Sequence, residues 1–70
     1  MESILKAKDF YLQKQCSCGG TLTQTFLKIG TNVMVKIKPK RNYFEIYVSN
    51  KLTSKGNSGQ FETELSNYVD

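Results

Sequence analysis

The residues with the most distinctive chemistry in this chain are two cysteines, Cys16 and Cys18, which are separated by one serine and followed by two glycines. Deprotonated thiols bind zinc, and a closed zinc site uses four ligands, most often from cysteine or histidine. The chain has no other cysteine and no histidine, so one copy cannot complete a site made of cysteine and histidine ligands alone. Aspartate or glutamate would have to add ligands, or two chains would have to pool four thiolates across a dimer axis.

The Cys16–Gly20 segment resembles one half of a zinc ribbon or knuckle, which implies a metal held by Cys16 and Cys18. The alternative interpretation is a tight turn that follows a helix and holds two small, half-buried thiols. We favour the turn, because zinc knuckles usually have two residues, not one, between their cysteines. A redox role is a weaker hypothesis, since a disulfide between cysteines this close in sequence would be strained.

Other side chains that support catalysis are missing or unsuitably spaced. Without histidine, the chain lacks the most common general base. Glu62 and Glu64 are two positions apart, which places them on different faces of a helix and not in an acid–base pair. The Gly56–Gly59 segment lacks the lysine of a phosphate-binding loop. We therefore predict that the protein is not an enzyme and needs no cofactor, with zinc as the one candidate.

A β-hairpin over residues 33–48 is the clearest structural signal in the sequence. Apolar and polar residues alternate on both sides of residues 39–42. With these four residues as the loop, Ile37 lies opposite Phe44, and every inward-facing pair is apolar on both strands. A slip of one residue would destroy this agreement, so the pattern specifies the register.

The flanking segments predict a small α+β domain. Residues 2–15 place apolar side chains on one helical stripe, and residues 21–29 are rich in β-branched and aromatic types. Residues 49–59 have the composition of a mobile loop, and residues 60–69 have helical spacing, with a fourth strand as the alternative. The predicted fold is a single domain (αβββα): a three-stranded antiparallel meander with an N-terminal and a C-terminal helix packed on one face.

The faces of this predicted sheet follow from the length of the turn that precedes the hairpin. A three-residue turn at Gly30–Asn32 aligns Ile29 with Val33 and Leu27 with Val35. The predicted inner face then consists of Thr25, Leu27, Ile29, Val33, Val35, Ile37, Phe44, Ile46 and Val48. The predicted binding residues lie on the outer face or at the hairpin tip: Phe26, Met34, Lys36, Lys38, Lys40, Arg41, Tyr43 and Tyr47.

The outer face is open to three interpretations. Cross-strand pairs such as Lys36 with Glu45 are ordinary on a solvated sheet. Phe26, Met34 and Tyr47 are also suited to an apolar patch that docks a protein partner or a second copy. Aromatic side chains between lysines are typical of platforms for single-stranded nucleic acid. As functions we predict protein–protein contact first, nucleic-acid binding second, and a zinc-dependent dimer third.

Charge and composition indicate the kind of partner, the cellular location and the source that we expect for this protein. The net charge is +4, and residues 10–44 contain lysine and arginine but no acidic residue, which suggests an anionic partner for this part of the chain. The chain has no apolar run long enough to cross a bilayer and no apolar signal-peptide segment, so we expect a cytoplasmic protein without a membrane partner. The Lys-, Asn-, Ile- and Tyr-rich composition suggests a bacterial or phage-like source.

The predicted order of elements, helix–strand–strand–strand–helix, resembles that of the double-stranded RNA-binding domain. That family grips phosphates with the basic start of its last helix. The corresponding segment here is Gln60–Glu64, which is acidic, and the histidine of the family's loop is absent. The resemblance therefore implies an arrangement of elements, but we do not infer the RNA-binding function from it.

Overall fold

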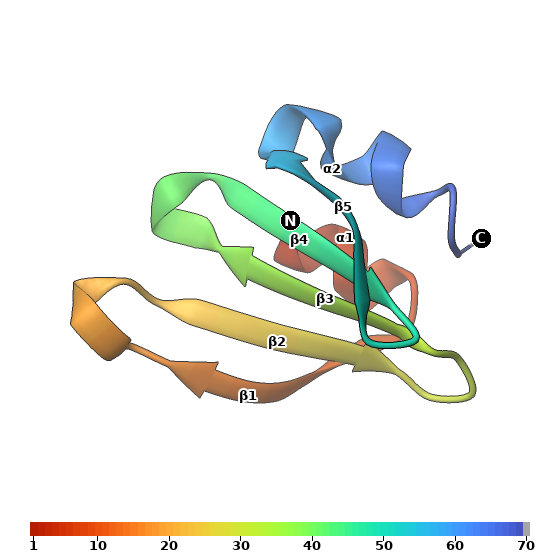
Figure 1. The fold of residues 1–70 in the computed structure, drawn as a ribbon, viewed down its shortest axis with the longest axis horizontal. Coiled ribbons are helices and arrows are strands. Elements are labelled where there is room, and N and C mark those ends of the chain that lie inside the picture. The colour runs from red at the N-terminus through yellow and green to blue at the C-terminus, as the bar shows by residue number, and fades with distance from the viewer. Residues whose placement is uncertain (70) are drawn as a thin grey trace.

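The computed structural model describes residues 1–69, with the exception of the Cys18 side chain. Its strands form one five-stranded antiparallel sheet in chain order, β1-β2-β3-β4-β5, and a short helix lies at each end of the chain (Figure 1). The elements, in order, are α1 (Glu2–Ala7), β1 (Phe10–Cys16), the 3-10 turn η1 (Cys18–Gly20), β2 (Thr23–Lys28), β3 (Val33–Lys38), the 3-10 turn η2 (Pro39–Arg41), β4 (Tyr43–Val48), β5 (Lys51–Asn57) and α2 (Ser58–Leu65).

The β3–β4 hairpin confirms the predicted register. Val33 lies opposite Val48, Ile37 opposite Phe44, and Lys38 opposite Tyr43. The η2 turn closes the hairpin, and Asn42 ends it with a left-handed backbone (φ 55°), a conformation that asparagine tolerates better than most residues. The alternation of apolar and polar residues therefore predicted the pairing of the two strands at the centre of the sheet correctly.

The predicted faces of β2 are wrong, because the turn into β3 is longer than expected. Phe26 pairs with Val35 and Leu27 with Met34, so four residues from Ile29 onward, not three, join the strands. This shift of one position turns each side chain of the strand to the opposite face. Phe26 is fully buried in the core, whereas Ile29 is 84% exposed in the turn.

The predicted N-terminal helix is also wrong over most of its length. Helix α1 ends at Ala7, and Asp9 adopts a left-handed backbone (φ 68°) that turns the chain into β1. Strand β1 pairs with β2, but the register shifts between Leu12 and Lys14, which leaves Gln13 as an extra residue in a bulge. The bulge interrupts the two-residue alternation of a strand, so the sequence of this segment also fits a helix.

Residues 49–59 are not a mobile loop, because most of them form strand β5. Ser49 and Asn50 both have positive φ (52° and 68°), which is typical of a two-residue type I′ hairpin turn between β4 and β5. A second bulge leaves Thr53 as the extra residue, and its hydroxyl donates a hydrogen bond to the Ile46 carbonyl at 3.0 Å. The polar composition of the segment, which resembles that of a turn, is explained by its position in an exposed strand at the edge of the sheet.

Both helices pack on one face of the sheet, as predicted. The Phe61 ring of α2 meets the Phe44 ring of β4 edge-to-face, with 5.1 Å between the ring centroids. The α2 helix confirms the helical interpretation of the C-terminal segment, and the Asn57 side chain caps it by accepting a hydrogen bond from the Gly59 amide. The buried core consists of Leu5, Phe10, Phe26, Val33, Val35, Ile37, Phe44, Ile46, Phe61, Leu65 and Val69.

The fold is therefore α+β, with five strands instead of the three predicted. Since the double-stranded RNA-binding domain matched only the predicted order, the similarity of element order does not hold for the observed fold. Neither described helix is long and apolar enough to cross a membrane.

Candidate binding surface

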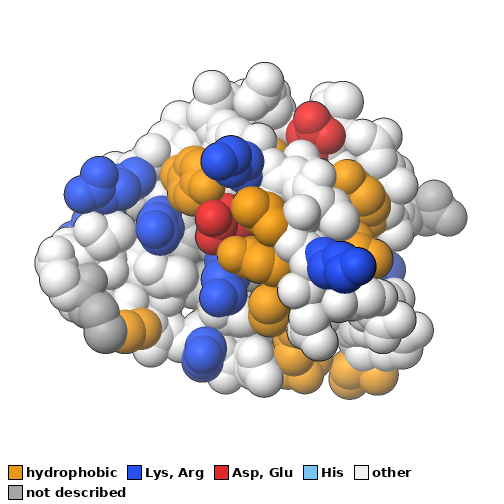
Figure 2. All heavy atoms as spheres, in the orientation of Figure 1, with side chains coloured by type: hydrophobic (Ala, Val, Ile, Leu, Met, Phe, Trp, Pro, Cys, Tyr) orange, Lys and Arg blue, Asp and Glu red, His pale blue; other side chains and the backbone are white. Residues whose placement is uncertain are grey.

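The face of the sheet opposite the helices carries a continuous line of large apolar side chains, which we call the apolar row. Its five members occupy successive paired positions on β1 to β5: Tyr11, Leu27, Met34, Tyr47 and Leu52. The two ends of the row, Tyr11 and Leu52, are 44% and 46% exposed, and the three central side chains are half-buried. Figure 2 shows hydrophobic side chains in a band that crosses the strands on this face.

A second line of paired side chains, which we call the basic row, runs beside the apolar row. It is two residues away along β2, β3 and β4, and three residues away along β1 and β5, where the bulges add one residue. Its members are Lys14, Thr25, Lys36, Glu45 and Lys55. Thr25 is only 2% exposed although it lies on the open face, so its longer neighbours cover it. The surface of this row is therefore formed by three lysines and one glutamate, and Figure 2 shows Lys and Arg side chains beside the hydrophobic band.

Glu45 joins two tyrosines at the centre of this face. Alternation along β4 places Tyr43, Glu45 and Tyr47 on the same side, and both phenol hydroxyls donate to the glutamate carboxylate, at 3.0 Å and 3.3 Å. Burial raises the pKa of both phenols above the usual value of 10.0, and the hydrogen bond and charge of Glu45 raise it further. The tyrosines therefore stay neutral and hold the carboxylate in one orientation.

Two lysines from β3 lie over these tyrosine rings. The Lys36 ammonium is 5.3 Å from the centroid of the Tyr47 ring, and the Lys38 ammonium is 5.7 Å from that of Tyr43. A cation at this distance is attracted to the negative face of an aromatic ring. The centre of the open face is thus a network of two tyrosines, two lysines and one glutamate with defined positions.

The structure brings most of the predicted binding residues together. Met34, Lys36, Lys38, Tyr43 and Tyr47 share the open face. The predicted hairpin tip is the η2 turn, where Lys40 and Arg41 are exposed between the end of β3 and the start of β4.

The prediction that Phe26 is a binding residue is wrong. Phe26 is part of the core and cannot contact a partner, because its strand is turned over relative to the prediction. Its neighbour Leu27 takes the place on the open face that was assigned to Phe26.

Sequence reasoning also missed the members of the two rows that lie on the edge strands: Tyr11, Lys14, Leu52 and Lys55. Each of these side chains lies on an edge strand that was not predicted, β1 or β5. A signal was present in the Ser49–Asn50 pair, since a polar pair after the alternating Tyr43–Val48 segment is compatible with a hairpin turn and a further strand. For β1, the bulge at Gln13 interrupts the alternation of apolar and polar residues that would have indicated a strand.

The structure leaves the zinc-dependent dimer untested. The Cys16 sulfur is disulfide-bonded in this structure, and the Cys18 side chain lies outside the described residues. A sulfur in a disulfide is not a thiolate ligand, so zinc binding by Cys16 requires its reduction. Among the residues described, no group of three or more cysteine, aspartate or glutamate side chains is placed to hold a metal.

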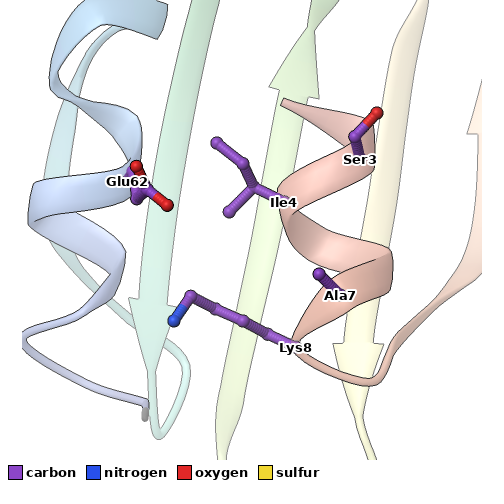
Figure 3. A pocket seen from close by; sticks show the side chains of 5 residues that line it. All are labelled: Ser3, Ile4, Ala7, Lys8 and Glu62. Carbon is purple, nitrogen blue, oxygen red and sulfur yellow. The ribbon is translucent and has the colours of Figure 1, made fainter.

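A groove of about 440 Å³ separates the two helices on the opposite face of the molecule. Figure 3 shows that Ile4 reaches into it from α1 and Lys8 from the end of this helix, while Glu62 borders it from α2. Ser3 and Ala7 complete the lining, so the groove combines one hydroxyl, one ammonium and one carboxylate with apolar walls. Among the described residues, no hydrogen bond joins the hydroxyl to the ammonium or the carboxylate, as it would in a nucleophile paired with its base. The open face is therefore the stronger candidate site.

Comparison with known proteins gives no independent indication of function. No protein-family model matches the chain, and no curated protein and no solved structure is significantly similar to it. The functional argument therefore depends on the physical properties of the open face.

Proposed function

We propose that the chain is a small non-catalytic binding domain that contacts a protein partner through the open face of its sheet. The observation that carries this proposal is the apolar row, which crosses all five strands on the face that the helices do not cover. Single exposed apolar residues are ordinary on protein surfaces. A contiguous apolar strip bordered by charged side chains is instead typical of an interaction site.

The order of the surface supports the same proposal. Hydrogen bonds from Tyr43 and Tyr47 fix Glu45, and Lys36 and Lys38 are drawn to the tyrosine rings. Side chains that already occupy defined positions lose less conformational freedom on association. These side chains are thus preorganised, which reduces the entropic cost of binding a partner.

Nucleic-acid binding is the second candidate, and the exposed Lys40 and Arg41 at the hairpin tip favour it. Phosphate groups would be attracted to this tip and to the lysines of the open face. Two features favour a protein partner instead. Lysine ammonium groups lie over the tyrosine rings on which bases would stack, and the Glu45 carboxylate lies at the centre of the face, where a phosphate backbone would be repelled.

Selection from a random peptide library tests the proposed function. A phage-displayed library of random 16-residue peptides would be selected against the wild-type chain, and each clone would be tested against Met34→Glu and Ile29→Glu. We expect clones whose binding is lost with Met34→Glu, because it puts a charge in the middle of the apolar row. Ile29→Glu is the matched control, since Ile29 is exposed in the turn between β2 and β3 and is not a member of the row.

Leu52→Glu provides a second variant at an exposed end of the row, in case the change at Met34 disturbs folding. Thermal unfolding of all variants would show which of them are folded. A selection that yields no clone sensitive to folded row variants would refute the proposal. Steep, salt-dependent binding of single- or double-stranded oligonucleotides, lost in a Lys40→Gln/Arg41→Gln variant, would support the nucleic-acid alternative instead.

A further inference from the structure

The geometry of the two rows also constrains the shape and charge of the partner, an inference that rests on the proposed function. We infer that the partner segment is an acidic, amphipathic α-helix that lies across the strands. Its apolar stripe packs on the apolar row, and acidic side chains along one flank face the basic row.

The spacing along the apolar row suits a helix better than an extended segment. Neighbouring strands lie about 4.8 Å apart, so a row that crosses five strands is about 19 Å long. A helix repeats its apolar stripe about every 5.4 Å and covers this length with about 13 residues. An extended segment places side chains of one face about 6.7 Å apart, which fits the interval between strands less well.

The basic row lies at the right distance to contact one flank of such a helix. On β2, β3 and β4 the two rows are two residues apart, or about 6.7 Å, which is close to the half-width of a helix with its side chains, about 5–6 Å. Lys14, Lys36 and Lys55 would then face the same flank of the partner, with Lys38 two residues further along β3. Their combined positive charge selects acidic side chains on that flank.

A second copy of the chain fits this surface less well. Two open faces packed together would carry the same excess of lysine, and Glu45 is the one acidic side chain in the two rows described above. The apolar row is also only one residue wide on each strand. A stable dimer typically buries about 800 Å² on each partner, which would require the lysines themselves to be buried against like charges.

A patterned peptide library tests the inferred partner. Its 14-residue members would carry apolar residues at positions i, i+4, i+7 and i+11, and each flanking position would be drawn equally from Glu, Lys and Gln. We expect selection to enrich Glu on one flank. The best clone, made as a synthetic peptide, should gain helical circular dichroism when it binds the chain, and amide shifts should map its site to the open face.

Two triple variants with the same net charge provide the decisive control. Lys14→Gln/Lys36→Gln/Lys55→Gln removes the lysines of the basic row, and we expect it to weaken peptide binding by about tenfold or more. Lys6→Gln/Lys8→Gln/Lys51→Gln removes three lysines outside the row and should change binding less than about twofold. Absence of Glu enrichment, enrichment of Lys, or equal losses in the two variants would overturn the inference.

The two libraries separate failure of the inference from failure of the proposed function. If random peptides bind the open face but patterned helices do not, the face is a protein-binding site for a partner of another shape, and the helical inference is wrong. If neither library yields a clone that depends on the apolar row, the proposed function is wrong as well.

Discussion

The two sides of the β3–β4 hairpin are made from alternate residues of the same strands, yet they differ in polarity and exposure. On the helix-covered side, Phe44 and Ile46 are fully buried and pack by shape. On the open side, Tyr43 and Tyr47 are large and partly apolar, but their hydroxyls contact a charged group. The difference teaches that one strand can stabilise the fold with one set of residues and present a defined surface with the other.

The largest expected effect comes from two neighbouring residues of β2 that face opposite sides. Phe26→Ala should destabilise the chain by about 3–5 kcal/mol, because it leaves a cavity in the core. Leu27→Ala removes a half-buried side chain and should cost about 1 kcal/mol, within the range of ordinary surface and boundary substitutions. Urea unfolding of both variants measures this contrast. A larger loss for Leu27→Ala would mean that the faces of β2 are reversed.

The next largest effect is a loss of folding stability at high pH, where Tyr43 and Tyr47 of the open face ionise. Their pKa values are raised in the folded chain, so above pH 10 the unfolded chain loses phenol protons while the folded chain retains them. Stability should therefore fall as the pH rises through this range, and the contribution is fully present below it. An absorbance titration of tyrosinate, together with unfolding measured as a function of pH, would follow both changes.

Glu45→Gln sharpens this prediction because it removes the carboxylate charge and leaves an amide of similar size. The pKa values of Tyr43 and Tyr47 should both move down, since the negative charge that opposes their ionisation is gone. Glu64→Gln, on helix α2 and away from the open face, is the matched control and should leave the tyrosine titration unchanged. A titration that is the same in wild type and Glu45→Gln would contradict the observed network.

The smallest effect is expected for the lysine that covers Tyr47. Lys36→Gln removes the ammonium group over the ring but keeps much of the aliphatic stem, so it should cost less than about 1 kcal/mol of stability. The same substitution should weaken binding of an acidic partner more than it weakens folding. Parallel measurements of unfolding and of peptide binding would show whether the open face contributes mainly to association.

The sequence predicted the centre of this fold better than its edges, and the reasons are physical. Strict alternation in Val33–Val48 leaves one register that buries all apolar pairs. The Ile29 position shows the limit of such patterns, because an apolar residue next to a strand can belong to the turn. One added turn residue then exchanges Phe26 and Leu27 between the two faces.

The edge strands escaped prediction because both contain an irregularity. Gln13 and Thr53 are extra residues that break the alternation, and Asp9 and Ser49 enter their turns with left-handed backbones that no apolar pattern reports. The candidate site was therefore predicted in its central part, on β3 and β4. The apolar row became visible only when five strands placed one residue each in line.

The two bulges have a consequence for how this small protein avoids aggregation. An outer strand with regular, unpaired backbone groups is a template onto which another chain can add a strand, and repetition of that step leads to fibrils. Here the bulges at Gln13 and Thr53 interrupt both outer strands and increase their local twist. Lys14 and Lys55 add repulsion beside them. The irregular edges thereby discourage growth by strand addition, and the open face of the sheet is left as the surface for the proposed partner.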